Sequence, residues 1–192
     1  MKKYLTIVLM VLMMGIAKGQ GVKFGVKGGL NLMSVSGAQT KGKNIVGFHL
    51  GGLVAVKLFE QFRLQPELLY STKGTKEEYY GIEMKTDLSY LDLPIMVRYF
   101  VVKGFSIDAG PQLSYLLAAK GTSNSEYVVF ENNLKKMDYG VNLGTGMDLE
   151  NGLLFQLRYY FGLADITKAD TYYNMDPKAH NNGLQVSMGY KF

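Results

Sequence analysis

The sequence predicts an all-β protein, an eight-stranded antiparallel up-and-down transmembrane β-barrel that follows an N-terminal signal peptide. Three observations support this fold class. From Val22 onward, apolar and polar side chains alternate with a period of two, which is typical of strands with one apolar face. Short and long connections alternate between these segments, as in the hairpin meander of outer-membrane barrels. The first residues have the composition of an export signal.

The N-terminal segment has the three parts of a signal peptide. Two lysines follow Met1, an apolar stretch comes next, and Ala17 and Gly19 are the small residues of a cleavage site before Gln20. The alternative is a membrane anchor, but the apolar stretch is shorter than the roughly 20 residues that a spanning helix needs. We therefore expect a signal peptide over residues 1–19 and a barrel over residues 20–192.

The alternation is clearest at the end of the chain, where Leu184, Val186 and Met188 share one face with the aromatic residues Tyr190 and Phe192. Similar segments recur throughout the sequence, each near the roughly 9–11 residues that a tilted strand needs to cross a bilayer. The expected strands are 22–32, 48–58, 62–72, 88–101, 105–117, 138–150, 153–163 and 184–192.

The connections between these strands are alternately short and long. Tight turns are expected at Glu60-Gln61, Lys103-Gly104 and Asn151-Gly152, and an Asn-Gly pair strongly favours a type I′ hairpin. The long polar connections are 33–46, 73–87, 118–136 and 164–182. This arrangement places both ends of the barrel on the short-turn side, which faces the periplasm in outer-membrane barrels.

Aromatic residues should form a row at each end of the outer apolar band, as in the interfacial girdles of membrane barrels. The row at the short-turn end is predicted to comprise Phe24, Phe62, Phe105, Phe155 and Phe192. The row at the long-loop end is predicted to comprise Phe48, Tyr70, Tyr115, Tyr139 and Phe161.

Three prolines, Pro66, Pro94 and Pro111, fall inside expected strands, where each removes a hydrogen-bond donor from the ladder. We expect bulges or unpaired positions there, and a change of inside to outside around each proline is a possible consequence.

The alternative fold is a soluble barrel or sandwich. Against it, the polar faces contain few Lys and Glu residues and many Gly, Ser, Gln and Asn residues, and the chain closes on an aromatic residue. We expect Tyr190 and Phe192 to form an assembly signal.

Three segments resemble the PorT-like outer-membrane β-barrel family: Leu64–Gly74 (LQPELLYSTKG), Tyr90–Phe100 (YLDLPIMVRYF) and Gly110–Leu117 (GPQLSYLL). The opening Gly25–Asn31 (GVKGGLN) is also similar, so the resemblance covers the whole mature chain. It implies a barrel in the cell outer membrane and includes the prolines as family features. It implies little about activity, because one fold serves many functions.

The alternation predicts a network of charged side chains inside the barrel. An eight-stranded barrel has an interior just wide enough for side chains to fill, and buried charges must be paired to offset their desolvation. The favoured interpretation is a salt-bridged plug, and the alternative is a narrow path for ions or protons. The predicted members are Lys57, Arg63, Glu67, Asp92, Arg98, Asp108, Asp148 and Arg158.

The residues that support catalysis or metal binding are scarce. The sequence has no cysteine and only two histidines, His49 and His180. We expect His49 to fill space inside the barrel and His180 to lie in the last long loop near Asp176. A catalytic triad or a zinc site needs more partners than these. We therefore predict no enzyme activity, no cofactor and no metal site. The chain has 21 basic and 16 acidic residues. Three of the lysines lie in the expected leader, so the barrel itself has little excess positive charge, and we expect no nucleic-acid binding.

Recognition is expected at the long loops, because loops on a rigid scaffold commonly carry binding function. They contain tyrosines among charged and small polar residues, for example at 76–80, 125–127 and 170–176. The predicted function is a structural or loop-mediated binding role, and the alternative is a small channel or transporter for a small solute. The expected partners are outer-membrane lipid, the barrel assembly machinery and an extracellular ligand at the loops, with the barrel itself a monomer.

Removal of the leader is directly testable. Intact-mass analysis of protein from the outer-membrane fraction should give the mass of a chain that begins at Gln20, because the small residues before it suit signal peptidase. Retention of residues 1–19 in that fraction would contradict the signal-peptide assignment.

Overall fold

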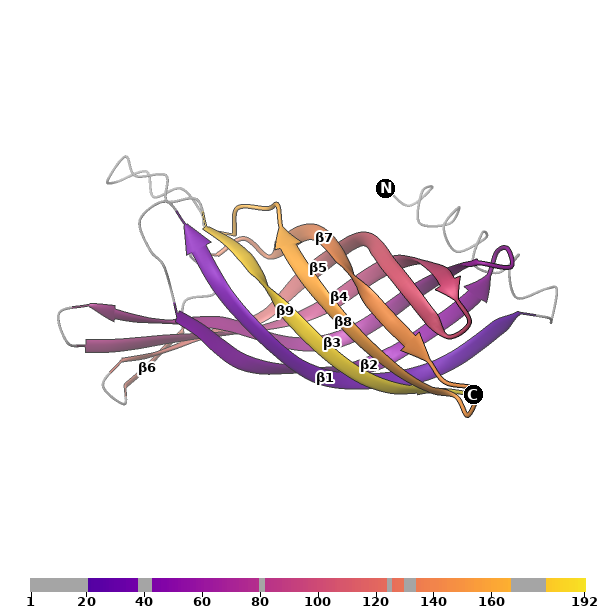
Figure 1. Cartoon of the computed structure of the whole chain (residues 1–192). Coiled ribbons are helices and arrows are strands. Elements are labelled where there is room, and N and C mark those ends of the chain that lie inside the picture. The colour runs from indigo at the N-terminus through magenta and orange to yellow at the C-terminus, as the bar shows by residue number, and fades with distance from the viewer. Residues whose placement is uncertain (1–20, 38–42, 80–81, 124–125, 130–133, 167–178) are drawn as a thin grey trace.

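Antiparallel strands close into one barrel in the computed structural model of the chain (Figure 1). The structure describes residues 21–37, 43–79, 82–123, 126–129, 134–166 and 179–192. The strands within these ranges are β1 (Val22–Gly37), β2 (Lys43–Lys57), β3 (Phe62–Tyr79), β4 (Ile82–Val102), β5 (Phe105–Ser123), β6 (Glu126–Val129), β7 (Met137–Asp148), β8 (Leu153–Gly162) and β9 (Ala179–Lys191). No helix in the described part of the chain is long and apolar enough to cross a membrane.

Eight of these strands form the barrel wall in the order β1–β2–β3–β4–β5–β7–β8–β9, and each pairs with the next in antiparallel register. The wall closes where β9 pairs with β1 from Gly25↔Lys191 to Gly37↔Ala179. Closure matters because a free strand edge in hydrocarbon would leave backbone groups without hydrogen-bond partners. The predicted fold class, an eight-stranded antiparallel barrel, is confirmed.

The strands at the long-loop end are longer than predicted. The segment 73–87 was expected to be a loop, but β3 and β4 remain paired from Lys73↔Leu88 to Tyr79↔Ile82 and form a long hairpin. Figure 1 shows this hairpin extending beyond most of the wall. The short strand β6 adds to the end of β5, with Lys120 opposite Val129. The polar composition of these segments hid their strand character, because in water both faces of a hairpin can be polar.

The predicted alternation of inside and outside is confirmed along the wall. Outward-facing side chains are apolar and exposed, such as Val186 and Leu157, whereas the residues between them are buried. All ten aromatic residues predicted for the two rows face outward. Phe48 and Tyr70 contact each other, with ring centroids 5.9 Å apart. Phe62 contacts Tyr99 on the neighbouring strand, at 4.9 Å between centroids.

The three prolines each interrupt the ladder on one side. The β2–β3, β3–β4 and β4–β5 registers lack consecutive pairs beside Pro66, Pro94 and Pro111, respectively, because proline has no N–H to donate. On its other side each proline keeps a partner, and the register on either side of each gap is unchanged. The prediction of unpaired positions is therefore confirmed, while the possible change of facing does not occur. The irregular registers in these ladders lie elsewhere, for example between Ser89 and Tyr90.

Glycines on the inner face make room for large side chains from the opposite strands. Gly146 of β7 is buried opposite Ser106 of β5. A Cβ atom at this position would collide with the guanidinium group of Arg98 and would lie 3.0 Å from the Ser106 hydroxyl. Gly52 of β2 faces outward instead, and a Cβ there would meet only the Gly25 carbonyl oxygen, at 3.8 Å.

Gly146→Ala should therefore destabilise the barrel, because the added methyl group displaces Arg98 from its partners. Overpacking of this kind typically costs about 1–3 kcal/mol. Urea unfolding of the refolded protein, followed by tyrosine fluorescence, measures the change. Gly52→Ala is the matched control and should leave the midpoint nearly unchanged. Equal effects of the two substitutions would show that the inner face has spare room at Gly146.

Candidate functional site

The barrel interior is the site where ionisable side chains converge, and it is organised in levels along the barrel axis. Nearest the short-turn end, Arg98 of β4 is completely buried. Its Nε donates to both carboxylate oxygens of Asp108, at 3.0 and 3.1 Å, and one terminal nitrogen donates to Asp148 at 2.9 Å. Asp148 also pairs with Arg63 at 2.9 Å and with Lys191 at 2.6 Å. A single carboxylate thus joins three cationic side chains from three strands.

The middle level is centred on Glu67 of β3. Both of its carboxylate oxygens accept from the guanidinium group of Arg158 on β8, at 2.7 and 3.0 Å. The ammonium group of Lys27 on β1 lies 2.8 Å from the same carboxylate. All three side chains are almost completely buried. Because β3 and β8 are not neighbours in the sheet, this forked ion pair crosses the lumen.

His49 adjoins the middle level and is buried, as predicted. Its Nδ1 lies 2.8 Å from the Asn31 side-chain oxygen, and its Nε2 lies 2.8 Å from the Ser187 hydroxyl. Both ring nitrogens are therefore occupied by neutral polar groups.

The upper level surrounds Lys73, whose side chain is completely buried. Its ammonium group lies 3.1 Å from Asp92 and 3.3 Å from the Ser114 hydroxyl. It also lies over the rings of Tyr90 and Tyr160, at 4.6 and 4.7 Å from their centroids. Rings within about 6 Å attract a cation through their quadrupole, so this lysine is held by one carboxylate and two aromatic faces.

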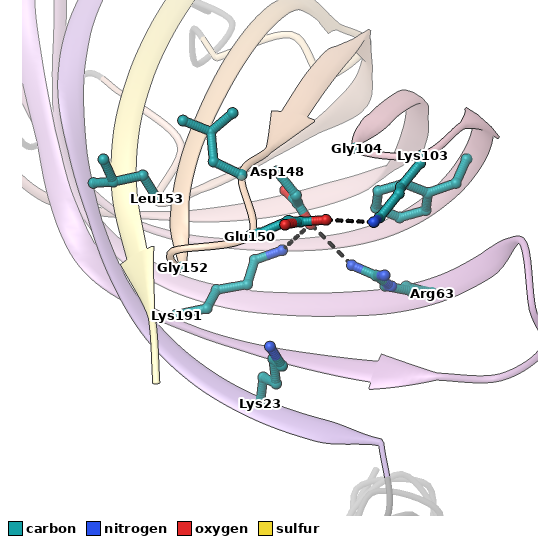
Figure 2. A pocket seen from close by; sticks show the side chains of 11 residues that line it. Lys23, Arg63, Lys103, Gly104, Asp148, Glu150, Gly152, Leu153 and Lys191 are labelled. Atoms are coloured by element: carbon teal, nitrogen blue, oxygen red, sulfur yellow. Dashed lines mark hydrogen bonds and ion pairs between the residues drawn. The ribbon is translucent and has the colours of Figure 1, made fainter.

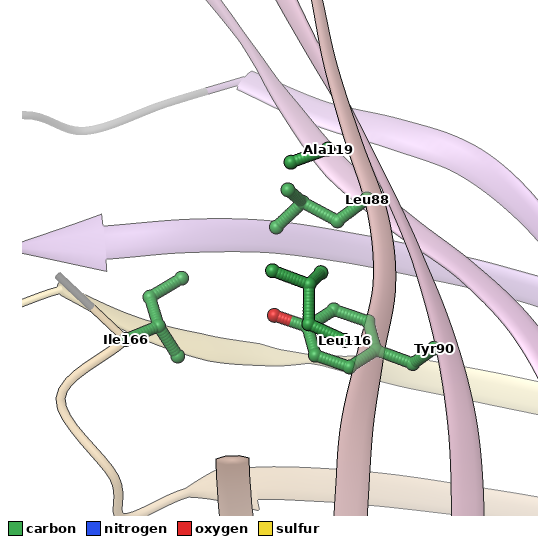
Figure 3. Packing of buried hydrophobic residues seen from close by; sticks show 5 residues of the cluster. All are labelled: Leu88, Tyr90, Leu116, Ala119 and Ile166. Atoms are coloured by element: carbon green, nitrogen blue, oxygen red, sulfur yellow. The ribbon is translucent and has the colours of Figure 1, made fainter. Parts of the chain in front are cut away.

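An apolar cap closes the lumen above Lys73 (Figure 3). Ile166, from the segment after β8, packs with side chains that face inward from β4 and β5. Backbone hydrogen bonds hold this segment in place: the Lys135 N–H donates to the Ile166 carbonyl at 2.8 Å, and the Ile166 N–H donates to the Ala179 carbonyl at 2.9 Å. The cap comprises Leu88, Tyr90, Leu116, Ala119 and Ile166.

Most of the residues predicted for the charge network lie in these levels. Arg98, Arg158, Glu67, Asp92 and Asp108 are buried in the lumen, and Arg63 and Asp148 lie near its short-turn mouth. Lys57 lies apart from these levels. It faces the correct side but is the last residue of β2, where the lumen opens to water, and its side chain is exposed.

Sequence reasoning missed three cations of the network. Lys27 and Lys191 have the parity of the inner face, so strict use of the alternation would have found them. Lys73 was assigned to a loop because the third strand was expected to end before it.

His180 was also misplaced: it lies in β9, where its Nδ1 donates to the Ala164 carbonyl at 2.8 Å. Asp176 lies outside the described residues, as does residue 19 with the rest of the expected leader.

Tyr190 and Phe192 lie on the outer surface of the closing strand. Their rings are 5.6 Å apart, and the Phe192 N–H donates to the Phe24 carbonyl at 2.8 Å. Phe192 is 71% exposed. The last residue of the chain therefore completes the seam between the first and last strands and presents an aromatic ring outward.

Comparison with known structures identifies the same architecture in outer-membrane proteins. Neisserial surface protein A (NspA) matches with a TM-score of 0.61 and 13% sequence identity, over 90% of this chain and all of that chain. Ail, the attachment invasion locus protein of Yersinia pestis, matches with a TM-score of 0.53 and 15% identity, over 90% of this chain and 99% of that chain. At these identities the likeness shows the fold.

No curated protein matches the sequence. A family model does, described as "Outer membrane protein beta-barrel domain", over residues 17–168. This match spans most of the chain and agrees with the closed eight-stranded wall and its outward apolar band. The chain belongs to the outer membrane protein beta-barrel domain family, and its place is the outer membrane.

Proposed function

We propose that this protein is a sealed outer-membrane scaffold that presents its long-loop end for binding and does not conduct solutes. The observation that carries the proposal is the filled lumen. Arg98 and Arg158 are the largest completely buried side chains, and their carboxylate partners come from other strands. Together with the apolar cap above them, these paired side chains fill the described part of the lumen.

The binding role is supported by the hairpin of β3 and β4, which extends the wall at the end that faces outward from the cell in barrels of this type. Pairing of the two strands limits the entropy that the hairpin would lose on binding. Ail, which has the same fold, has been solved in complex with the heparin analogue sucrose octasulfate, so one barrel of this architecture binds a ligand. For the present chain we propose an extracellular ligand at the long-loop end.

We further propose that the protein is not an enzyme. Neither histidine is placed to act as a general base with a carboxylate partner, since His49 contacts Asn31 and Ser187 and His180 contacts a backbone carbonyl. The described residues contain no group of three or more His, Cys, Asp or Glu residues that could hold a metal ion.

The remaining partners are proposed from the outer surface. The apolar band and its two aromatic rows suit outer-membrane lipid, and the aromatic end of β9 suits recognition by the barrel assembly machinery. We also propose a cleaved leader over residues 1–19, a monomeric state and, from the segments around Pro66, Pro94 and Pro111, membership of the PorT-like group within the family.

Arg98→Ala tests the plug. The substitution leaves Asp108 buried, with Arg158 3.9 Å away as its nearest remaining cation. Removing one partner of a buried pair typically costs about 3–5 kcal/mol, and less where water enters. The urea midpoint should therefore fall markedly. Val186→Ala removes methyl groups from the lipid-facing surface and should have a smaller effect. An unchanged midpoint for Arg98→Ala would contradict the plug.

Conductance separates a sealed scaffold from the alternative, a small channel or transporter. In planar bilayers the refolded protein should stay near the baseline current, because charged side chains and the apolar cap fill the lumen. Arg98→Ala, if it inserts, should show a higher current, since it removes the completely buried arginine of the lower level. Steady conductance by the unmodified protein would overturn the sealed-barrel proposal and favour the channel.

A further inference from the structure

The short-turn mouth of the barrel contains a hollow of about 180 Å³ that the scaffold role does not use (Figure 2). Residues from several strands and two tight turns line it. Lys23 of β1, Arg63 of β3 and Lys191 of β9 supply cations from three sides. Figure 2 shows the Lys23 side chain directed toward the same space as Arg63 and Lys191. Lys23, Arg63 and Lys191 have the parity of the inner face of the wall.

The charges that surround this hollow do not balance. Lys103 and Glu150, both on the tight turns, neutralise each other as an exposed ion pair. Asp148 is the remaining carboxylate of the lining, and it serves Arg63 and Lys191 together. Arg98 also contacts Asp148 but is already matched by both oxygens of Asp108.

Lys23 adds an unpaired positive charge to the lining of the hollow. It is exposed and makes no ion pair with any described residue. Arg63, Lys191 and Lys23 thus face the hollow with a single carboxylate between them. The lining of the hollow carries a positive excess that a doubly charged anion would neutralise.

The Arg63 side chain is already fixed in a position from which it can bind such an anion. Its guanidinium group is stacked on the Phe100 ring, 4.0 Å from the centroid, and one of its terminal nitrogens donates to Asp148. Its side chain is 32% exposed, so part of the group remains accessible from the mouth. A planar guanidinium presents paired N–H donors that match the oxygens of a phosphate or carboxylate. Because stacking and the ion pair already fix the side chain, little rotamer entropy is lost on binding.

We propose that this mouth is a binding site for a small, soluble, doubly charged oxyanion of the phosphate class that enters from the periplasm. Arg63 supplies the forked donors, and Lys23 and Lys191 supply the compensating charge. The site is independent of the sealed lumen, because it lies below Arg98 and needs no passage through the barrel.

Isothermal titration of the refolded protein with inorganic phosphate, at constant ionic strength set with chloride, tests the site. One saturable event per barrel is expected. Lys23→Gln should weaken it by roughly tenfold, which corresponds to about 1.4 kcal/mol, without affecting folding because Lys23 has no ion pair to lose. Arg63→Gln should weaken it further. Lys57→Gln is the matched control, since Lys57 is an exposed lysine of the same rim that does not line the hollow.

Two outcomes would overturn the proposal from different directions. If no saturable event occurs, or if Lys57→Gln weakens binding as much as Lys23→Gln does, the mouth attracts anions only through diffuse charge. If phosphate binds in detergent but is excluded in nanodiscs that contain phosphatidylglycerol, a lipid headgroup occupies the site and the soluble ligand is wrong. Binding that persists in those nanodiscs and depends on Lys23 supports the proposal.

Discussion

The forked ion pair between Glu67 and Arg158 is the interaction on which the interior of this barrel depends. Its two residues come from strands on opposite sides of the wall. Neither charge can reach water, so each is tolerable only while the other is in place. Lys27 joins the pair from a third strand. The constraint therefore extends beyond local stability: the strands must close in one register, because a slip of one strand would separate these buried charges from one another.

The same requirement explains the distribution of small residues on the inner face. Arginine and lysine side chains are long, and an eight-stranded wall leaves little space between opposite strands. Glycine at position 146 leaves room for the Arg98 guanidinium group. Large and small inward residues are thus complementary across the lumen, while the outward residues need only be apolar. The inward residues therefore specify how the strands fit together, and the outward residues make the barrel compatible with lipid.

The two ends of the lumen are closed by different physical means. At the long-loop end, Ile166 and the side chains around it exclude water with an apolar cap held by backbone hydrogen bonds. At the short-turn end, the partly exposed Arg63 and the buried Lys191 pair with one carboxylate, Asp148. An apolar cap resists ions of either sign, whereas a mouth with excess positive charge attracts anions.

The sequence alone determined the strand count, the facing of almost every side chain and the two aromatic rows, because the pleat of a strand forces successive residues to opposite faces. It also identified Arg98, Arg158 and Glu67 as interior charges. Only the tertiary structure decided which acid meets which base, since that depends on the curvature and stagger of the closed wall. Asp92, for example, pairs with Lys73, a residue that sequence reasoning placed in a loop. The tertiary structure also decided the length of β3 and β4. The two strands continue past the apolar band because each supplies the other's hydrogen-bond partners. Such pairing leaves no periodic signal in a polar stretch of sequence.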